Sequence, residues 1–448
     1  MGGNRAARAA IYPPDLVEVI VRGLQLQREC DHQAGCAECP LNSALAQALT
    51  DEEGIRTFQM VKEARDEYTG EELDAALVHE AKKEELAYFK SKRVWRVVPR
   101  HRARGQRVVG TRWVNSNKGD HEHPEIRCRL VAQEVKTYES DEFFAATPLT
   151  ESLKLIISMA AEDPRRQVTL VDISRAYFNA KIGRKVYVEL PPEAGYGKNF
   201  IGELDKCMYA TRDAAQGWEL TYFAALVQEL GFKRGAAHPC VFRHEGRDVN
   251  LTVHGDDFLA EGRPEAFDWF EKALLTKFEG KIKGRLKRDG DEIRLLSRVV
   301  RRTTEGYEWE ADQRHAELIV SGMGLLPSSK PLAAPGRKLT NKEREEDNED
   351  QLDGADSSKY RGLAAQANFL AQDRPDIAYA VKELCRGMSK PTARDMEALK
   401  RLARYLAGKP RVILHFGWQR ARPAHWTSTQ TVTGPGASAR GAPRQEGH

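Results

Sequence analysis

QVTLVDIS at residues 167–174 and LTVHGDDFLA at residues 251–260 are the stretches that decide the fold. Each is a short run of apolar and β-branched residues, the composition expected of a buried strand, and the first run is expected to lead into a helix. Asp172 interrupts the first run, and the adjacent Asp256 and Asp257 lie where the second is predicted to make a tight hairpin. Because a carboxylate is costly in an apolar strand, these three acids indicate a functional site.

An ordinary polar turn is the alternative for the adjacent acids, since Asp is common in turns. The functional interpretation is favoured because Gly255 precedes the pair and apolar strands flank it. Adjacent carboxylates repel each other unless a cation neutralises them. Mg²⁺ takes oxygen ligands and bridges substrate phosphates, so three converging carboxylates suit two-metal phosphoryl or nucleotidyl transfer.

Strand-like and helix-like segments alternate outward from these runs. Apolar residues recur at helical spacing in 71–89, 220–232, 376–388 and 393–408. Short β-branched runs such as RVVGTRWV at 107–114 are typical of strands. This alternation predicts an α+β domain whose sheet is mostly antiparallel.

Composition limits the class of protein further. The 448 residues suffice for two or three domains, and 41% hydrophobic with 30% charged residues is typical of a soluble globular protein. Residues 90–136 are rich in Lys and Arg. This stretch is either a solvated face or a surface that attracts phosphates of a nucleic acid or a triphosphate. No apolar run reaches bilayer length and no signal peptide is evident, which predicts an intracellular protein without a membrane partner.

Residues 1–70 form a separate N-terminal segment of unassigned role. Four of its side chains are of zinc-ligand type: Cys30, His32, Cys36 and Cys39. Their spacing matches no common zinc finger, so reduced thiols are the alternative to a zinc site. Nothing in the sequence indicates an oligomeric state.

Many motifs between about Asp74 and Trp418 resemble, in the same order, the reverse transcriptases of copia-type retrotransposon Pol polyproteins. Among these motifs are WRVVP, TRWV, RCRLVA, QVTLVDISRAYFNA, HGDD, RPDIAYAV and ALKRLARYLAG, which begin at Trp95, Thr111, Arg127, Gln167, His254, Arg374 and Ala398. The resemblance implies an α+β right-hand polymerase, with fingers, a palm on an antiparallel sheet, and a C-terminal helical connection segment.

The resemblance also implies an activity, RNA-directed DNA polymerisation, with two Mg²⁺ ions as cofactor. The partners would be an RNA or DNA template–primer and deoxynucleoside triphosphates. Asp172, Asp256 and Asp257 would be catalytic, with Asp172 and Asp256 binding the Mg²⁺ ions. Tyr177 would exclude a ribose 2′-hydroxyl. The other nucleotide-binding candidates are Lys118, Arg127, Arg129, Asp213 and Gln216.

Two departures from the family pattern bear on activity. His254 and Gly255 replace the usual Tyr-Val before the Asp pair, and Asp213 replaces a Gln that contacts the incoming nucleotide. Gln216 takes the place of that Gln only if the alignment with the family pattern shifts by three residues. A negative charge there is expected to weaken triphosphate binding, so the alternative function is a catalytically decayed fragment that only binds nucleic acid.

We therefore expect five segments. They are an N-terminal segment (1–70), reverse transcriptase fingers and palm (71–340), an acidic linker (341–358), a connection region (359–418) and a disordered tail (419–448). The tail replaces the ribonuclease H domain that the resemblance implies. A one-base shift of reading frame across His425 to His448 yields a peptide similar to the opening of that domain. This favours a frameshift or a gene-model error between Trp418 and Trp426.

Overall fold

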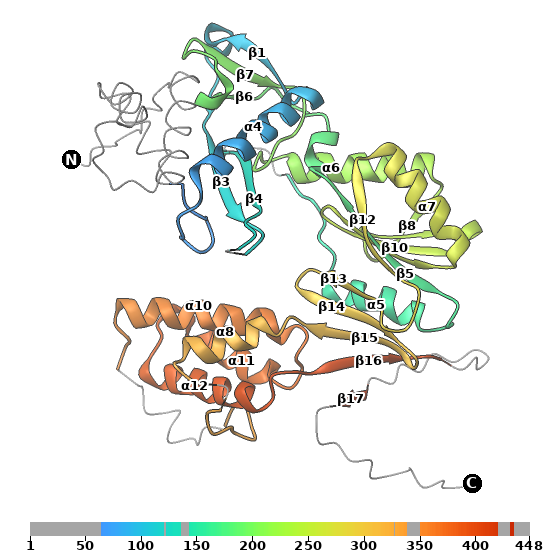
Figure 1. Cartoon of the computed structure of the whole chain (residues 1–448), viewed down its shortest axis with the longest axis vertical. Helices are drawn as coiled ribbons and strands as arrows, with labels where there is room; N and C mark the ends of the chain where they lie inside the picture. Colours follow the sequence, from blue (N-terminus) through green and yellow to red (C-terminus); the bar gives the residue numbers. More distant parts are fainter. Residues whose placement is uncertain are drawn as a thin grey trace, which may run out of the picture. The chain divides into compact units, whose positions relative to one another are not determined.

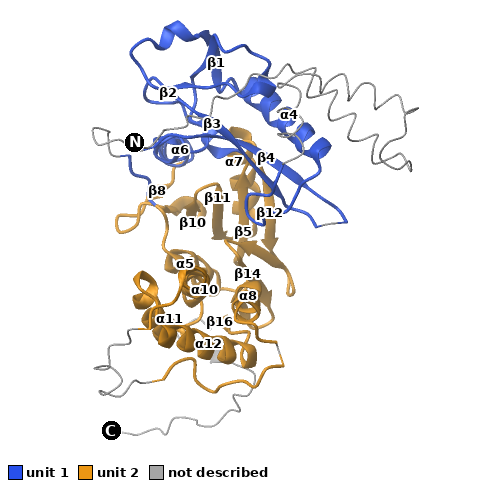
Figure 2. Cartoon of the chain, turned by 90° about the vertical axis from the view of Figure 1, so that its left-hand side faces the viewer, with its two compact units in different colours: residues 1–146, 175–230 blue, residues 147–174, 231–448 orange. Residues whose placement is uncertain are grey.

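The computed structural model describes residues 64–120, 122–135, 143–326, 328–337 and 350–419, and the backbone of 431–433. These residues divide into two compact units (Figure 2). Unit 1 lies within 1–146 and 175–230, and unit 2 within 147–174 and 231–448. The predicted fingers and palm domain at 71–340 is thus split between two units. The predicted connection region at 359–418 is part of unit 2 rather than a separate body.

In its described residues, unit 1 combines a small sheet with a hairpin and two α-helices (Figure 1). Its sheet has the order β1 (Trp95–Pro99), β7 (Phe200–Leu204), β6 (Tyr187–Val188), β2 (Val108–Val109), and the hairpin joins β3 (Thr111–Asn117) to β4 (Ile126–Ala132). The helices are α4 (Ala75–Lys92), α6 (Ala214–Phe223) with a π-helical extension at Ala224–Glu229, and 3-10 turns at Arg100–Ala103, Ala176–Asn179 and Pro192–Ala194. The Asp74 carboxylate caps α4 by accepting from the N–H groups of Ala76 and Leu77.

Unit 2 contains the sheet predicted from the two opening stretches. Its order is β12 (Gly280–Leu286), β5 (Gln167–Ile173), β11 (Asp257–Gly262), β10 (Val249–His254), β9 (Val241–His244), β8 (Lys233–Arg234). Every neighbouring pair in it is antiparallel, which confirms the predicted sheet type. Helices α5 (Thr150–Ala160) and α7 (Pro264–Lys277) pack on it.

A second sheet and a helical layer complete unit 2. The sheet has the order β13 (Glu292–Leu295), β14 (Arg298–Thr303), β15 (Gly306–Ala311), β16 (Ile413–Gly417), β17 (Thr431–Thr433). The helices are α8 (Arg314–Gly322), α10 (Gly354–Ala371), α11 (Ala378–Arg386) and α12 (Ala393–Gly408), with 3-10 turns at Glu245–Arg247 and Gly387–Ser389. Helix α5 contributes Ile156 and Ile157 to a core that both sheets share.

Three expectations are corrected. The acidic linker was predicted to reach residue 358, but α10 begins at Gly354 because the Asp353 carboxylate caps it. Part of the predicted disordered tail, Thr431–Thr433, pairs with β16 as an antiparallel strand. The helix expected after Asp172 is only the 3-10 turn at 176–179. Residues 1–63, with the four zinc-ligand candidates, lie outside the described residues. Within the described part of the chain, no helix is both long and apolar enough to cross a membrane.

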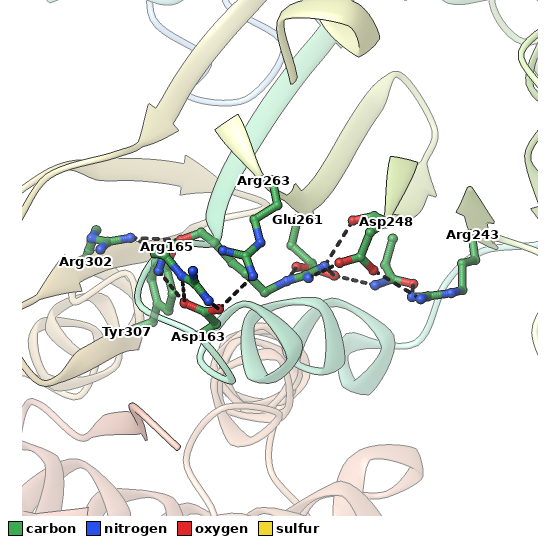
Figure 3. A network of polar contacts seen from close by, with 10 residues as sticks. Asp163, Arg165, Arg243, Asp248, Glu261, Arg263, Arg302 and Tyr307 are labelled. Atoms are coloured by element: carbon green, nitrogen blue, oxygen red, sulfur yellow. Dashed lines mark hydrogen bonds and ion pairs between the residues drawn. The ribbon is translucent and has the colours of Figure 1, made fainter. Parts of the chain in front are cut away.

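Ion pairs lie at the end of the β5–β11 pairing in unit 2 that is remote from Asp172 (Figure 3). Arg166 donates to both carboxylate oxygens of Glu261, which is fully buried, and to the carboxylate of Asp248. Burial raises the pKa of Glu261, and its contacts with Arg166 and Asn250 oppose that rise. Both acids are paired with Arg166, and Glu261 is buried with it, so we assign them a structural role.

Asp373 ties the helical layer of unit 2 to its second sheet. Its carboxylate, 2% exposed, accepts from Arg298 Nε at 2.7 Å and Trp309 Nε1 at 2.8 Å, and lies 3.1 Å from Lys154 Nζ. Asp373→Ala should destabilise unit 2 by about 3–5 kcal/mol, because it leaves the buried Arg298 charge uncompensated. Urea unfolding followed by Trp309 fluorescence measures this.

The matched control is Asp268→Ala, which removes a carboxylate whose side chain is 79% exposed and paired with Arg285. Because surface ion pairs contribute about 0–1 kcal/mol, this variant should unfold nearly as the wild type does. Equal effects of the two substitutions would contradict a structural role for Asp373.

Candidate active site

Asp172 and Asp257 face each other on adjacent strands of the first sheet in unit 2. They are paired in register between β5 and β11. A two-residue turn, Gly255–Asp256, joins β10 to β11, and Gly255 has a φ of +63°. Glycine tolerates this backbone conformation without strain, which explains its position before the Asp pair. The tight hairpin predicted from the sequence is confirmed.

Lys283 on β12 lies between these two carboxylates. Its Nζ is 2.7 Å from Oδ1 of Asp172 and 2.8 Å from Oδ1 of Asp257. Burial raises the pKa of Asp257, the neighbouring charges of Asp256 and Asp172 add to the rise, and Lys283 opposes it. Burial lowers the pKa of Lys283, but its contacts with Asp172 and Asp257 outweigh burial and raise it overall. One cation is thus already held where two carboxylates meet.

The course of β12 explains how Lys283 reaches this position. Gly280 pairs with Ile173, and a Cβ on Gly280 would lie only 2.4 Å from the carbonyl oxygen of Asp172. Only glycine therefore allows this approach. Two residues later the ladder is irregular between Ile282 and Gly284, so Lys283 has no partner on β5. Such a bulge redirects a side chain, here toward the carboxylates.

Asp256 occupies the turn itself. Its backbone carbonyl accepts from the N–H of Ile173 at 2.9 Å, which ties the hairpin to the end of β5. Among the described residues, no group of three or more His, Cys, Asp or Glu side chains is gathered tightly enough to hold a metal ion. The structure thus brings Asp172 and Asp257 together through one cation, while the sequence-based expectation pairs Asp172 with Asp256. Carboxylate oxygens that already share a cation are suitable donors for a divalent metal.

The nucleotide-binding candidates all lie in unit 1. On β4, Cys128 is buried, whereas Arg127 is exposed and Arg129 partly exposed, so the two arginines share a face of the strand. The guanidinium of Arg129 lies 5.4 Å from the ring centroid of Tyr209. Tyr177 packs edge-on against the same ring at 5.8 Å. Two of the candidates are therefore joined through Tyr209.

The contacts of Tyr209 and Lys118 were not expected from the sequence. Tyr209 carries no local signal for its contacts, because it lies in a loop far along the chain from both Tyr177 and Arg129. Burial raises its pKa to about 12, and the nearby arginines oppose that rise. Lys118 lies instead over the ring of Tyr68, 5.0 Å from its centroid.

A buried ion pair holds the turn that carries Tyr177. Glu85 of α4, 2% exposed, accepts from Arg175 Nε at 2.8 Å. Burial raises the pKa of Glu85, and the charge of Arg175 opposes that rise. Arg175 has a φ of +47° and also lies 4.0 Å from the ring centroid of Tyr88. The sequence carries no local signal for this pair, because its partners are 90 residues apart.

Asp213 is buried and paired rather than exposed to the incoming nucleotide. Arg184 donates to both oxygens of Glu134 at 2.6 Å and to Oδ1 of Asp213 at 3.0 Å. The carboxylate expected to repel a triphosphate thus has a cationic partner within unit 1. Asp213 directly precedes α6, and Gln216 lies in the first turn of that helix, partly exposed.

The α+β fold agrees with the family whose model matches part of the chain. Residues 92–291 match the family described as reverse transcriptase (RNA-dependent DNA polymerase). The relatives include the Pol polyproteins of transposon RE1 from Arabidopsis thaliana and transposon TNT 1-94 from Nicotiana tabacum. They are 26% and 25% identical over 68% and 70% of the chain. The Ty1-DR4 Gag-Pol polyprotein of Saccharomyces cerevisiae is 28% identical over 34% of the chain and 9% of its own length.

These matches define residues 92–291 as a reverse transcriptase domain of α+β fold. The chain is similar to the reverse transcriptase region of copia-type retrotransposon Pol polyproteins, which confirms the resemblance seen in the sequence. It spans about a fifth to a quarter of the length of the first two relatives, 20% and 24%. A foamy viral protease-reverse transcriptase solved in complex with dsDNA is a structural neighbour. Its TM-score is 0.39 at 10% identity, over 80% of this chain and 64% of that one.

Proposed function

We propose that this region catalyses RNA-directed DNA synthesis, adding deoxynucleotides to a primer paired with an RNA or DNA template. The observation that carries the proposal is the Asp172–Asp257 pair, which converges on one cation beside the Gly255–Asp256 turn. Reverse transcriptases depend on a divalent metal, and carboxylate oxygens suit one.

The residues of unit 2 would hold two Mg²⁺ ions. Asp172 and Asp256 are the proposed ligands of both ions, and Asp257 lies beside them as the third catalytic carboxylate. Bound there, the two ions would supply activation of the primer 3′-hydroxyl and stabilisation of the charge of the leaving pyrophosphate. Asp172 and Asp257 keep their positions because they are paired in register on the adjacent strands β5 and β11.

The residues of unit 1 would bind and select the nucleotide. Arg127 and Arg129, on one face of β4, present guanidinium groups that suit phosphate oxygens. Tyr177 is held against Tyr209, and its ring would exclude a ribose 2′-hydroxyl. Lys118 and Gln216 are further candidates for contacts with the nucleotide. Asp213 would shape the pocket through Arg184 rather than contact the nucleotide.

The decayed, binding-only fragment remains the alternative function. Its strongest argument was the negative charge of Asp213, and the ion pair with Arg184 weakens that argument. The remaining observation in its favour is that His254 and Gly255 replace the family's usual Tyr-Val before the Asp pair.

The proposal is tested by incorporation of labelled dTTP on poly(rA)/oligo(dT) with Mg²⁺, beside Asp256→Asn. We expect incorporation by the wild-type chain that the substitution abolishes. Absence of incorporation by a folded chain that still binds the duplex would support the binding-only alternative.

A further inference from the structure

The cation between Asp172 and Asp257 is a lysine, whereas other buried acids of unit 2 each have an arginine as a partner. Those acids are Glu261, Glu271, Glu310 and Asp373, the last of which also contacts Lys154. An arginine presents a rigid fork whose charge cannot be removed, which suits a permanent link. A lysine is a point charge on a flexible stem, so it can leave its partners without disturbing the backbone.

The Lys283 side chain can also move away from the carboxylates into solvent. Its side chain is 33% exposed, whereas the side chains of Asp172 and Asp257 are 18% and 9% exposed. The ammonium group therefore reaches the carboxylates from the solvent side. The bulge that places Lys283 outside the β5–β12 ladder leaves the strand pairing intact when the side chain swings out.

We propose that Lys283 is a displaceable internal counterion, which occupies the position between Asp172 and Asp257 until a divalent metal replaces it. This inference rests on the proposed metal site, in which Asp172 is a ligand and Asp257 is the adjacent catalytic carboxylate. An ammonium group on Asp172 and a divalent ion on the same carboxylate repel each other strongly, because the two like charges would lie very close together. Metal binding therefore requires Lys283 to leave. The free energy of its two ion pairs opposes metal binding and weakens the metal affinity.

The test measures metal binding directly, with Mn²⁺ on the full chain and without nucleotide or template. Electron paramagnetic resonance of free Mn²⁺ yields the dissociation constant. Lys283→Met removes the competing charge and should tighten Mn²⁺ binding by roughly tenfold or more. Lys283→Arg keeps a charge in place and should bind Mn²⁺ no more tightly than the wild type does.

Lys281→Met is the matched control. Lys281 lies on the same strand, is paired in register with Asp172 and is exposed, and no ion pair of its side chain is found among the described residues. Its removal should leave the Mn²⁺ dissociation constant within about twofold. An unchanged or weaker affinity in Lys283→Met would overturn the proposal, as would an equal gain in the Lys281 variant.

A second measurement follows the wild-type chain, with a folded Lys283→Gln variant used only to assign the signal. The NMR signal of the Lys283 ammonium group, assigned by its loss in Lys283→Gln, should move to the position of a solvated lysine as Mg²⁺ is added. A signal that does not respond while Mg²⁺ binds would overturn the proposal.

Metal binding also separates this inference from the proposed function. If Asp172→Asn abolishes Mn²⁺ binding and Lys283→Met leaves it unchanged, the metal site stands and the counterion role fails. If neither the wild type nor Lys283→Met binds Mn²⁺, the metal site fails and the counterion role fails with it. Tighter binding in Lys283→Met supports the counterion role even if the chain incorporates no dTTP.

Discussion

Asp172→Asn should lower dTTP incorporation on poly(rA)/oligo(dT) by at least about a thousandfold. The substitution keeps the size of the side chain but removes one of the charges that are proposed to hold the catalytic metals. Losing a single electrostatic contact to the transition state costs about 10²–10³ in rate, and a shared metal ligand should exceed that. Single-turnover incorporation with Mg²⁺ measures the effect.

Asp268→Asn makes the same chemical change on an exposed carboxylate of α7 in the same unit. Incorporation by this control should stay within about twofold of wild type. Duplex binding by Asp172→Asn should also be retained, since metal ligands are not the main contacts to the duplex backbone. Full activity of Asp172→Asn would rule out the proposed site.

Arg184→Met should destabilise unit 1 by about 3 kcal/mol. It removes the partner of two acids, Glu134 and Asp213, whose side chains are only 10% and 8% exposed. We take the lower end of the range for breaking a buried pair, because 28% of the Arg184 side chain is exposed. The two units need not unfold together, so native-state hydrogen exchange on unit 1 peptides is the appropriate measurement.

The double variant Arg184→Met with Asp213→Asn is the control, because it removes one of the two carboxylate charges that Arg184→Met leaves without their partner. It should recover part of the lost stability. If the double variant is as unstable as the sum of its single variants, Arg184 and Asp213 do not act as a pair.

The stability of unit 1 should depend on pH through Glu134. Burial raises its pKa, but the contacts with Arg184 and Arg212 outweigh burial and lower it below the ordinary value of 4.5. A lowered pKa contributes stability that is complete above pH 4.5 and is lost as the pH falls through the folded-state pKa. The difference between wild type and Arg184→Met should therefore shrink below pH 4.5.

The sequence determined the strands and the identity of the acids. Apolar runs at 167–174 and 251–260 predicted β5 and the β10–β11 hairpin, because local composition and a glycine before the turn decide such elements. The helices at 376–388 and 393–408 followed from their periodicity in the same way. Asp172, Asp256 and Asp257 were found because each breaks a pattern that is readable within a few residues.

The tertiary structure alone decided which charges meet. Lys283 lies 111 residues from Asp172 in sequence yet contacts it, because β12 adds to the edge of β5 at a glycine. The pairing of Asp213 with Arg184 and of Glu85 with Arg175 likewise depends on segments brought together by packing. Burial and long-range ion pairing are properties of the assembled core rather than of local sequence. The sequence therefore revealed the carboxylates, and only the fold showed which cation neutralises them.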